Sequence, residues 1–353
     1  MSHLEERMEA DLNYIRDWLW NIGEEVELAL RNAKKALILR DPEMAYDTIL
    51  GDHPINRESR QCDRLCHTFI ARYLPGAGAL REMASTIRIN VILERIGDYA
   101  VTISREALQI KSPLPERFST IIDSIADDSI EILSGSRTAF REGNAERAIA
   151  LMQAAKRMEG RMDGFYDELF AQDERMDATT KMVIFAVFNI LKRVADQAKN
   201  VCDQTVFAVR GVAKLPKVYR ILFLDKPGSG LGQLATAIGR HNFPDTAEFM
   251  SATPGLSEPV SDSLRDFLVE TGLPDEGLDS ESLEALQYDF SDYMVLVSVT
   301  GLVSDYVQKV PFHSVALNWS LTEEEDFAEQ YRQLRSQIIE LVTLLAGTET
   351  TQA

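Results

Sequence analysis

The chain has 353 residues, which is enough for two or three domains with separate hydrophobic cores. Its net charge of −19 disfavours non-specific binding to nucleic acid or to an anionic membrane surface. Its cysteines are few and odd in number: Cys62, Cys66 and Cys202. Such a set argues against a disulfide framework and predicts a reducing compartment. We find no apolar leader at the N-terminus and no apolar run long enough to span a bilayer, so we expect a cytoplasmic protein that is not membrane-inserted.

Three long helices are expected first in the chain. The first covers residues 11–39, where apolar residues recur at helical spacing. Asp41 as a cap and Pro42 at the first helical position begin the second helix, which runs to about Tyr73 with a possible interruption at His53-Pro54. A break is expected over residues 74–78, and the third helix follows it and ends near Ile110.

A pair of carboxylates stands out on the third helix, within the stretch Leu93-Glu94-Arg95-Ile96-Gly97-Asp98. Glu94 and Asp98 are four residues apart, so both project from one helix face. Their repulsion can be relieved by an arginine, by solvent or by a metal ion that takes oxygen ligands. A solvated helix face and a metal site are therefore the two interpretations of this pair.

The same organisation returns about a hundred residues later. Helices are expected over residues 116–142, 145–171 and roughly 176–209, and the last of them carries Leu191-Lys192-Arg193-Val194-Ala195-Asp196. Arg193 and Asp196 match Arg95 and Asp98, whereas Lys192 replaces Glu94. Two copies of a three-helix unit therefore fill about the first 210 residues.

This arrangement resembles the PhoU family of phosphate-signalling regulators. The resemblance covers residues 8–211 of a first domain at 1–211, with tandem three-helix bundles at about 8–110 and 116–210, and it includes Asp52, which follows the first hairpin. It implies a divalent or ferric metal ion on the first bundle, held by Glu94 and Asp98, with at most a weaker site through Asp196 on the second. Lys192 argues against a second site of equal strength, because an ammonium group cannot ligate a metal.

The character of the chain changes after the polar boundary at residues 211–217. Residues 219–224 predict a buried strand, 225–232 a glycine-rich turn, and 233–240 a helix, which together have the shape of a phosphate cradle. Further strands near residues 247–251, 293–299 and 314–318 alternate with helices at 261–271 and 323–346. We expect a small α/β domain with a mostly parallel sheet, and it is strongly acidic, with 22 acidic and 7 basic residues from Tyr219 onward.

Residues 219–346 resemble the low-molecular-weight phosphatase and arsenate reductase family. Its chemistry needs a cysteine thiolate that opens the loop and an arginine that closes it, and here those positions are Asp225 and Leu231. Glu323 falls near the place of the general acid. We therefore interpret the turn as a degenerate anion loop, formed by Asp225, Lys226, Gly228, Ser229, Gly230, Leu231 and Gly232. An ionised Asp225 is expected to oppose a bound phosphate, so that Asp225→Asn would improve anion binding.

The sequence thus predicts a multidomain, non-enzymatic regulator of phosphate signalling or transport that acts through protein–protein contacts and carries a pseudo-phosphatase domain. The resemblance implies a sensor histidine kinase and the ATPase of the phosphate importer as partners, and it allows a homo-oligomer. The alternative is a phosphatase or reductase with a non-cysteine mechanism that uses Asp225. A third class is a metal-dependent or nucleotide-sensing binding module.

Overall fold

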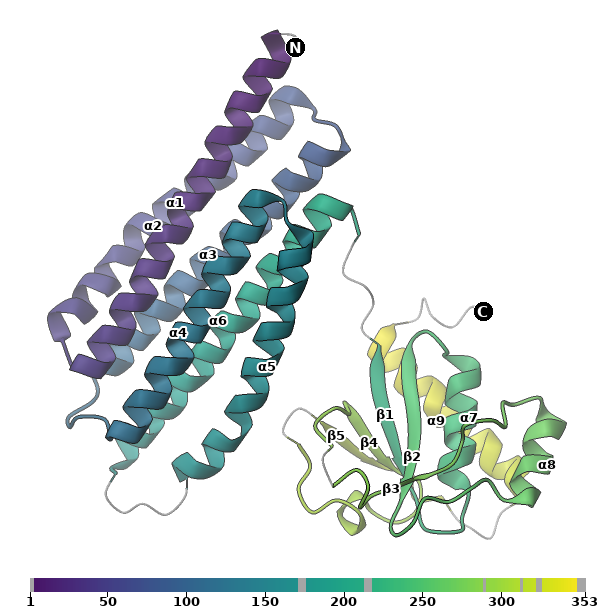
Figure 1. Cartoon of the computed structure of the whole chain (residues 1–353). Helices are drawn as coiled ribbons and strands as arrows, with labels where there is room; N and C mark the ends of the chain where they lie inside the picture. Colours follow the sequence, from purple (N-terminus) through teal and green to yellow (C-terminus); the bar gives the residue numbers. More distant parts are fainter. Residues whose placement is uncertain are drawn as a thin grey trace. The chain divides into compact units, whose positions relative to one another are not determined.

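We describe the protein from a computed structural model, which covers residues 3–170, 176–212, 218–287, 290–311, 314–321 and 326–347. The chain divides into two compact units, Met1–Lys214 and Leu215–Ala353, termed the helical unit and the α/β unit below. Figure 1 shows long helices in the first unit and a sheet with shorter helices in the second. Within the described residues, no helix is both long and apolar enough to cross a bilayer.

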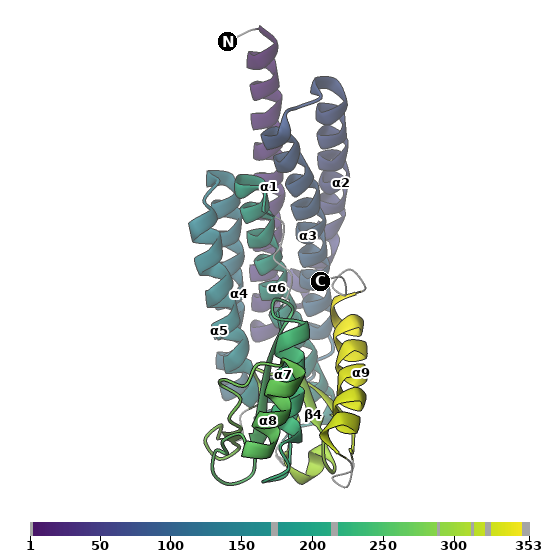
Figure 2. The same cartoon turned by 90° about the vertical axis from the view of Figure 1, so that its right-hand side faces the viewer.

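The helical unit contains six described helices: α1 (His3–Leu39), α2 (Pro42–Tyr73), α3 (Ala77–Ala107), α4 (Glu116–Glu142), α5 (Ala145–Phe170) and α6 (Ala178–Arg210). They run side by side in both views of the unit (Figures 1 and 2). Helices α1–α3 contact one another, as do α4–α6, which confirms the predicted pair of three-helix bundles. The Asp41 carboxylate accepts the N–H of Met44 and Pro42 opens α2, as expected from their spacing.

The interruption that we considered at His53-Pro54 is wrong, because α2 is continuous through Pro54. Proline within a helix removes one backbone hydrogen bond, and this loss alone predicts a break. The expected break over residues 74–78 is shorter than predicted, since α3 already begins at Ala77. Packing of α2 and α3 against each other and against α1 outweighs these local signals.

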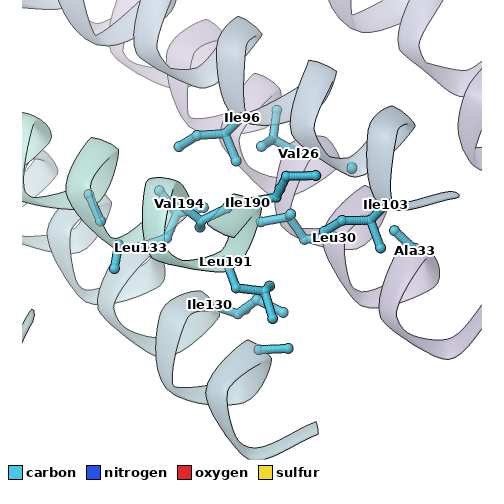
Figure 3. Close-up of a cluster of buried hydrophobic side chains, with 14 of the residues drawn as sticks. Val26, Leu30, Ala33, Ile96, Ile103, Ile130, Leu133, Ile190, Leu191 and Val194 are labelled. Atoms are coloured by element: carbon cyan, nitrogen blue, oxygen red, sulfur yellow. The ribbon is translucent and has the colours of Figure 1, made fainter. Parts of the chain in front are cut away.

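One hydrophobic core joins the two bundles. Helix α3 contacts α6, and α1 contacts α4. Figure 3 shows side chains from these four helices pointing toward one another: Val26, Leu30, Ala33, Ile96, Ile103, Ile130, Leu133, Ile190, Leu191 and Val194. The helical spacing of the apolar positions on each helix therefore builds one core from two repeats.

A buried arginine also ties the repeats together. Arg137 of α4 donates to the backbone oxygen of Trp20 at 2.8 Å and to Glu24 at 3.0 Å, and it pairs with the Glu27 carboxylate. Its guanidinium lies 4.4 Å from the centre of the Trp20 ring. A Cβ at Gly23 would overlap the Arg137 guanidinium, so the absence of a side chain at Gly23 makes room for this contact.

The α/β unit is built on a parallel sheet of five described strands in the order β3-β2-β1-β4-β5. The strands are β1 (Tyr219–Leu224), β2 (Ala247–Thr253), β3 (Glu281–Ser282), β4 (Val295–Ser298) and β5 (Val315–Asn318). The helices are α7 (Leu231–Asn242), α8 (Asp262–Thr271) and α9 (Phe327–Ala346), with a short turn of 3-10 helix at Val303–Asp305. The short strand β3 was not predicted, because two residues carry no periodic signal.

The sheet is covered differently on its two faces. Alternate strand residues such as Phe223 and Phe249 pack with α7, α8 and α9 in one core. Leu222 and Leu296 point to the other face and pack against loop residues such as Phe290 and Tyr306. The chain passes from β1 to β2 and β3 on one side and then returns to β4 on the other side of β1. The carboxyl ends of β1 and β4 therefore form the switch point where ligands bind in open α/β sheets.

Candidate functional site

The predicted carboxylate pair lies on the outer part of α3, where Asp98 is exposed and Glu94 is half-buried. The structure brings Asp98 together with Asp52 of α2. Burial raises the pKa of the Asp52 carboxyl above its usual value, and the negative charge of Asp98 raises it further. The Oδ1 of Asp52 lies close to Gly97 of α3, since a Cβ built at Gly97 would be 3.4 Å from it. Asp98 thus has the carboxylate of Asp52 on α2 as a neighbour, in addition to Glu94 one turn away on α3.

Two buried oxygens near Asp98, one on Asp52 and one on Asn56, accept no hydrogen bond from the described residues. Asn56 donates its Nδ2 to the Oδ2 of Asp52 at 2.6 Å, while the Oδ1 of Asp52 and the Oδ1 of Asn56 are buried and unpaired. Carboxylate and amide oxygens are the ligands that hard divalent cations take. The oxygens of Asp52, Asn56 and Asp98 are therefore of the chemical type that such a cation binds. This set of oxygens is small, and the described residues contain no group of three or more His, Cys, Asp or Glu side chains that could hold a metal ion.

The second repeat offers less to a metal ion. The Asp196 carboxylate lies 3.6 Å from the ammonium group of Lys199. Ala155, which corresponds to Asp52 in the second repeat, is buried in the core and has no ligating atom. Asp196 thus has a cation beside it and no second carboxylate where the first repeat has Asp52.

The glycine loop after β1 is built around Asp225, whose side chain is 1% exposed. Its Oδ1 accepts the N–H of Lys226 at 2.8 Å and the hydroxyl of Thr300 at 2.8 Å. Its Oδ2 accepts the hydroxyl of Ser229 at 2.5 Å and the N–H of Gly232 at 2.8 Å. In the structure the Asp225 carboxylate itself accepts the hydrogen bonds of the loop donors.

The other loop residues complete this arrangement. The N–H of Gly228 donates to the Glu258 Oε2 at 2.8 Å, and the N–H of Leu231 donates to the Ser229 Oγ at 3.2 Å. Gly228 and Gly230 both have positive φ, a conformation that glycine adopts without strain. Leu231, at the position expected for a phosphate-binding arginine, is 1% exposed and belongs to the core under α7. The loop thus has an apolar anchor in place of a cationic clamp.

Several residues of these sites were missed in the sequence. Thr300 follows β4 at the switch point beside β1, and a hydroxyl at the end of a strand is a signal that could have found it. Tyr306 hydrogen-bonds Thr300, and burial raises the pKa of its hydroxyl. Glu258 lies in a loop without periodicity, so only the folded chain brings it to Gly228. Glu323, the candidate general acid, lies outside the described residues.

The α/β unit has a weak similarity to a solved arsenate reductase in its phosphate-binding state. The identity is 19% and the TM-score 0.29, with 36% of this chain and 99% of that chain covered.

The helical unit has closer relatives. The PhoU domain family matches residues 19–107. The phosphate-specific transport system accessory protein PhoU homolog of Pseudomonas putida is 30% identical over 216 residues, covering 59% of this chain and 83% of that protein. The PhoU accessory protein of Edwardsiella tarda is 27% identical over 212 residues, covering 60% and 87%. The crystal structure of PhoU from Pseudomonas aeruginosa is similar with a TM-score of 0.55 at 26% identity, covering 58% of this chain and 99% of that chain. With its tandem bundles and the stretch at residues 93–98, this chain belongs to the PhoU family.

Proposed function

We propose that this protein is an accessory regulator of phosphate transport and signalling that acts in the cytoplasm through protein–protein contacts. The observation that carries the proposal is the 30% identity to a phosphate-specific transport accessory protein over nearly the whole helical unit. The partners we propose are the ATPase of the phosphate importer and a sensor histidine kinase. The α/β unit is an additional binding module without phosphatase turnover.

An arginine-rich surface on α2 and α3 supports a role in protein contacts. Arg57, Arg60 and Arg64 are exposed on α2 with helical spacing, and Arg88 and Arg95 are exposed on α3 seven residues apart. We propose that these five residues, of which Arg88 also contacts Gln204 and Phe207 of α6, form one surface, the arginine face. Residues 42–107 contain no lysine, and their exposed acidic residues are limited to Glu43, Asp47 and Asp98.

The composition of this face suits a protein partner. Exposed apolar side chains accompany the arginines, with Tyr46 at 55%, Leu50 at 63% and Val91 at 43% exposure. Arginine and tyrosine are enriched in protein interfaces, whereas lysine is depleted. Arginine also binds carboxylates through two parallel hydrogen bonds. The face is therefore suited to an acidic surface on a partner protein.

Binding of the purified chain to the importer ATPase and to the cytoplasmic part of the sensor kinase tests this proposal. Charge reversal by Arg60→Glu/Arg95→Glu is expected to weaken binding by at least about tenfold and to reduce its salt dependence. The control is Arg31→Glu/Lys35→Glu, which changes the net charge equally at exposed positions of α1. Equal binding by wild type and the arginine-face variant would contradict the assignment of this face. If wild type binds neither the importer ATPase nor the sensor kinase, the proposed function is wrong.

The absence of phosphatase turnover is tested with an aryl phosphate and with arsenate reduction. No cysteine is present from Tyr219 onward, and both oxygens of the buried Asp225 carboxylate are already hydrogen-bonded. A carboxylate held in this way cannot attack a phosphoryl group, since attack needs access and a free lone pair. Hydrolysis that is lost in Asp225→Asn would instead support the alternative, an aspartate-based phosphatase.

A further inference from the structure

The loop at Asp225–Gly232 has the arrangement of an oxyanion site, but a side chain of the loop itself accepts its hydrogen bonds. Strand β1 leads into a turn, and the first residues of α7 present backbone N–H groups toward the carboxyl edge of the sheet. Four donors converge on one point: the N–H groups of Lys226 and Gly232 and the hydroxyls of Ser229 and Thr300. At that point lies the carboxylate of Asp225, with donor–acceptor distances of 2.5–2.8 Å.

Three of the four donors belong to the loop that Asp225 opens, and the fourth, Thr300, comes from the end of another strand of the sheet. Thr300 lies 75 residues from Asp225 in sequence, two residues after the end of β4. A second carboxylate, from Glu258, accepts the Gly228 N–H. The backbone N–H groups of the loop thus donate to two carboxylates, those of Asp225 and Glu258. Negatively charged acceptors of this kind are the ones that such backbone donors bind most strongly.

The shape of the loop is set by its glycines independently of the carboxylate. A Cβ at Gly232 would lie 3.1 Å from the Cβ atoms of Asp225 and Ser251, so the helix start can approach β1 and β2 closely only without a side chain. Positive φ at Gly228 and Gly230 fixes the turn that precedes α7. Leu231 anchors the loop in the core. Shortening the Asp225 side chain therefore leaves the donors in place and removes their acceptor.

We propose that Asp225 is a built-in anion that permanently fills an oxyanion site of the α/β unit, so that this site excludes free carboxylates, phosphate and sulfate. Removal of the carboxylate opens a site for a small external oxyanion. The inference rests on the proposed lack of phosphatase chemistry in the α/β unit and is independent of the proposed regulatory role of the helical unit. It also explains why the phosphate-binding arginine is dispensable at position 231, since the anion in this site is covalently attached.

Chemical rescue of Asp225→Ala in the full chain tests the proposal. The variant lacks a group of the size of formate, so sodium formate is the first probe, and phosphate and sulfate are the second and third. Melting is followed by the fluorescence of Trp319, which packs on Phe223 of β1, after Trp18 and Trp20 have been replaced by phenylalanine. We expect the melting temperature of Asp225→Ala to rise by several degrees with formate and to saturate, as for a specific ligand. Chloride at equal ionic strength is expected to have no such effect.

Two controls separate a site from a general salt effect. Wild type should show no saturable shift, because its site is filled. Asp305→Ala removes an exposed carboxylate that accepts one backbone N–H, from Leu302 at 2.8 Å, and should not be rescued by formate. Equal shifts in wild type, Asp305→Ala and Asp225→Ala would overturn the proposal.

A second variant covers the case in which Asp225→Ala does not fold. Asp225→Ser keeps a small acceptor, and folding that appears only with formate, phosphate or sulfate would support the proposal as directly as a melting shift. If both variants stay unfolded at saturating concentrations of all three anions, Asp225 is not replaceable by an external oxyanion and the inference is wrong. Phosphatase turnover by wild type would contradict the proposed function and leave the rescue result unaffected, so the two failures are distinguishable.

Discussion

The two units treat a buried or half-buried aspartate in opposite ways. Asp225 in the α/β unit has four donors on its two oxygens, with two of them from the backbone. Asp52 in the helical unit accepts from Asn56 and faces a second carboxylate at Asp98. A regular helix uses its own N–H groups internally and has none to spare for a side chain in its middle, whereas a loop at the end of a strand has several. Around Asp52 the helical unit therefore has more hydrogen-bond acceptors than donors, whereas the loop and Thr300 supply a donor for every hydrogen bond that Asp225 accepts.

The largest effect is expected for Asp225→Asn. The amide oxygen can keep the N–H of Lys226 and the Thr300 hydroxyl, and Ser229 can turn its hydroxyl to accept from the amide nitrogen. The Gly232 N–H then faces an NH₂ group and has no acceptor. A buried unpaired donor together with the loss of charged hydrogen bonds costs about 2–4 kcal/mol in free energy of unfolding. Urea unfolding followed at Trp319 measures it, and the improved anion binding expected of this variant from the sequence stays a prediction.

A matched change in the same unit controls for the loss of one negative charge. Asp305→Asn alters an exposed carboxylate that accepts a single backbone N–H, from Leu302. We expect it to change the free energy of unfolding by less than about 1 kcal/mol, as for most exposed sites. An equal loss of stability in Asp225→Asn and Asp305→Asn would contradict the description of Asp225 as a filled anion site.

The second prediction concerns metal binding in the helical unit. If a divalent cation binds there, Asp52 and Asp98 supply its carboxylate oxygens, and Asp98→Asn is expected to weaken binding at least about tenfold, because a neutral amide replaces a charged ligand. Asp196→Asn is the control in the second repeat, where Lys199 lies beside the carboxylate and a smaller effect is expected. Titration calorimetry with manganese and magnesium measures the affinities. Equal affinity in wild type and Asp98→Asn would exclude Asp98 as a ligand.

Comparing the two sites shows how far the sequence alone could predict them. Helical periodicity and the loop after the first strand located both regions, because each depends on local spacing. The partners of each aspartate were not predictable in the same way. Asp98 approaches Asp52 only when α2 packs on α3, and Thr300 reaches Asp225 only because β4 lies beside β1. The sequence therefore located the carboxylates. Tertiary packing determined whether each meets hydrogen-bond donors, as Asp225 does, or a second negative charge, as Asp52 does.

A smaller effect is expected for Asp52→Asn, and its sign is opposite to that of Asp225→Asn. The pKa of Asp52 is raised in the folded state, so the folded protein favours its protonated form. The stability associated with this proton is present below the unfolded pKa and is lost as the pH rises through the folded pKa. At neutral pH, Asp52→Asn should therefore stabilise the helical unit by a few tenths of a kcal/mol, on the order of a like-charge helix pair. Its advantage should disappear as the pH falls toward about 4, near the unfolded pKa of aspartate, as measured by urea unfolding in the presence of a chelator.

The smallest effect is expected when the two units are separated. Each has its own apolar core, made in one case by α1–α6 and in the other by the two faces of the sheet. Because folding free energy comes mainly from such burial, fragments 1–212 and 218–353 should each fold alone and melt within a few degrees of the full chain. Limited proteolysis is expected to cut first near Lys214–Lys217, a segment outside the described residues. Calorimetry of the fragments and of the full chain provides the measurement. A first cut within residues 87–108 would contradict the continuous helix α3, and a fragment without a cooperative transition would show that the two units depend on each other for stability.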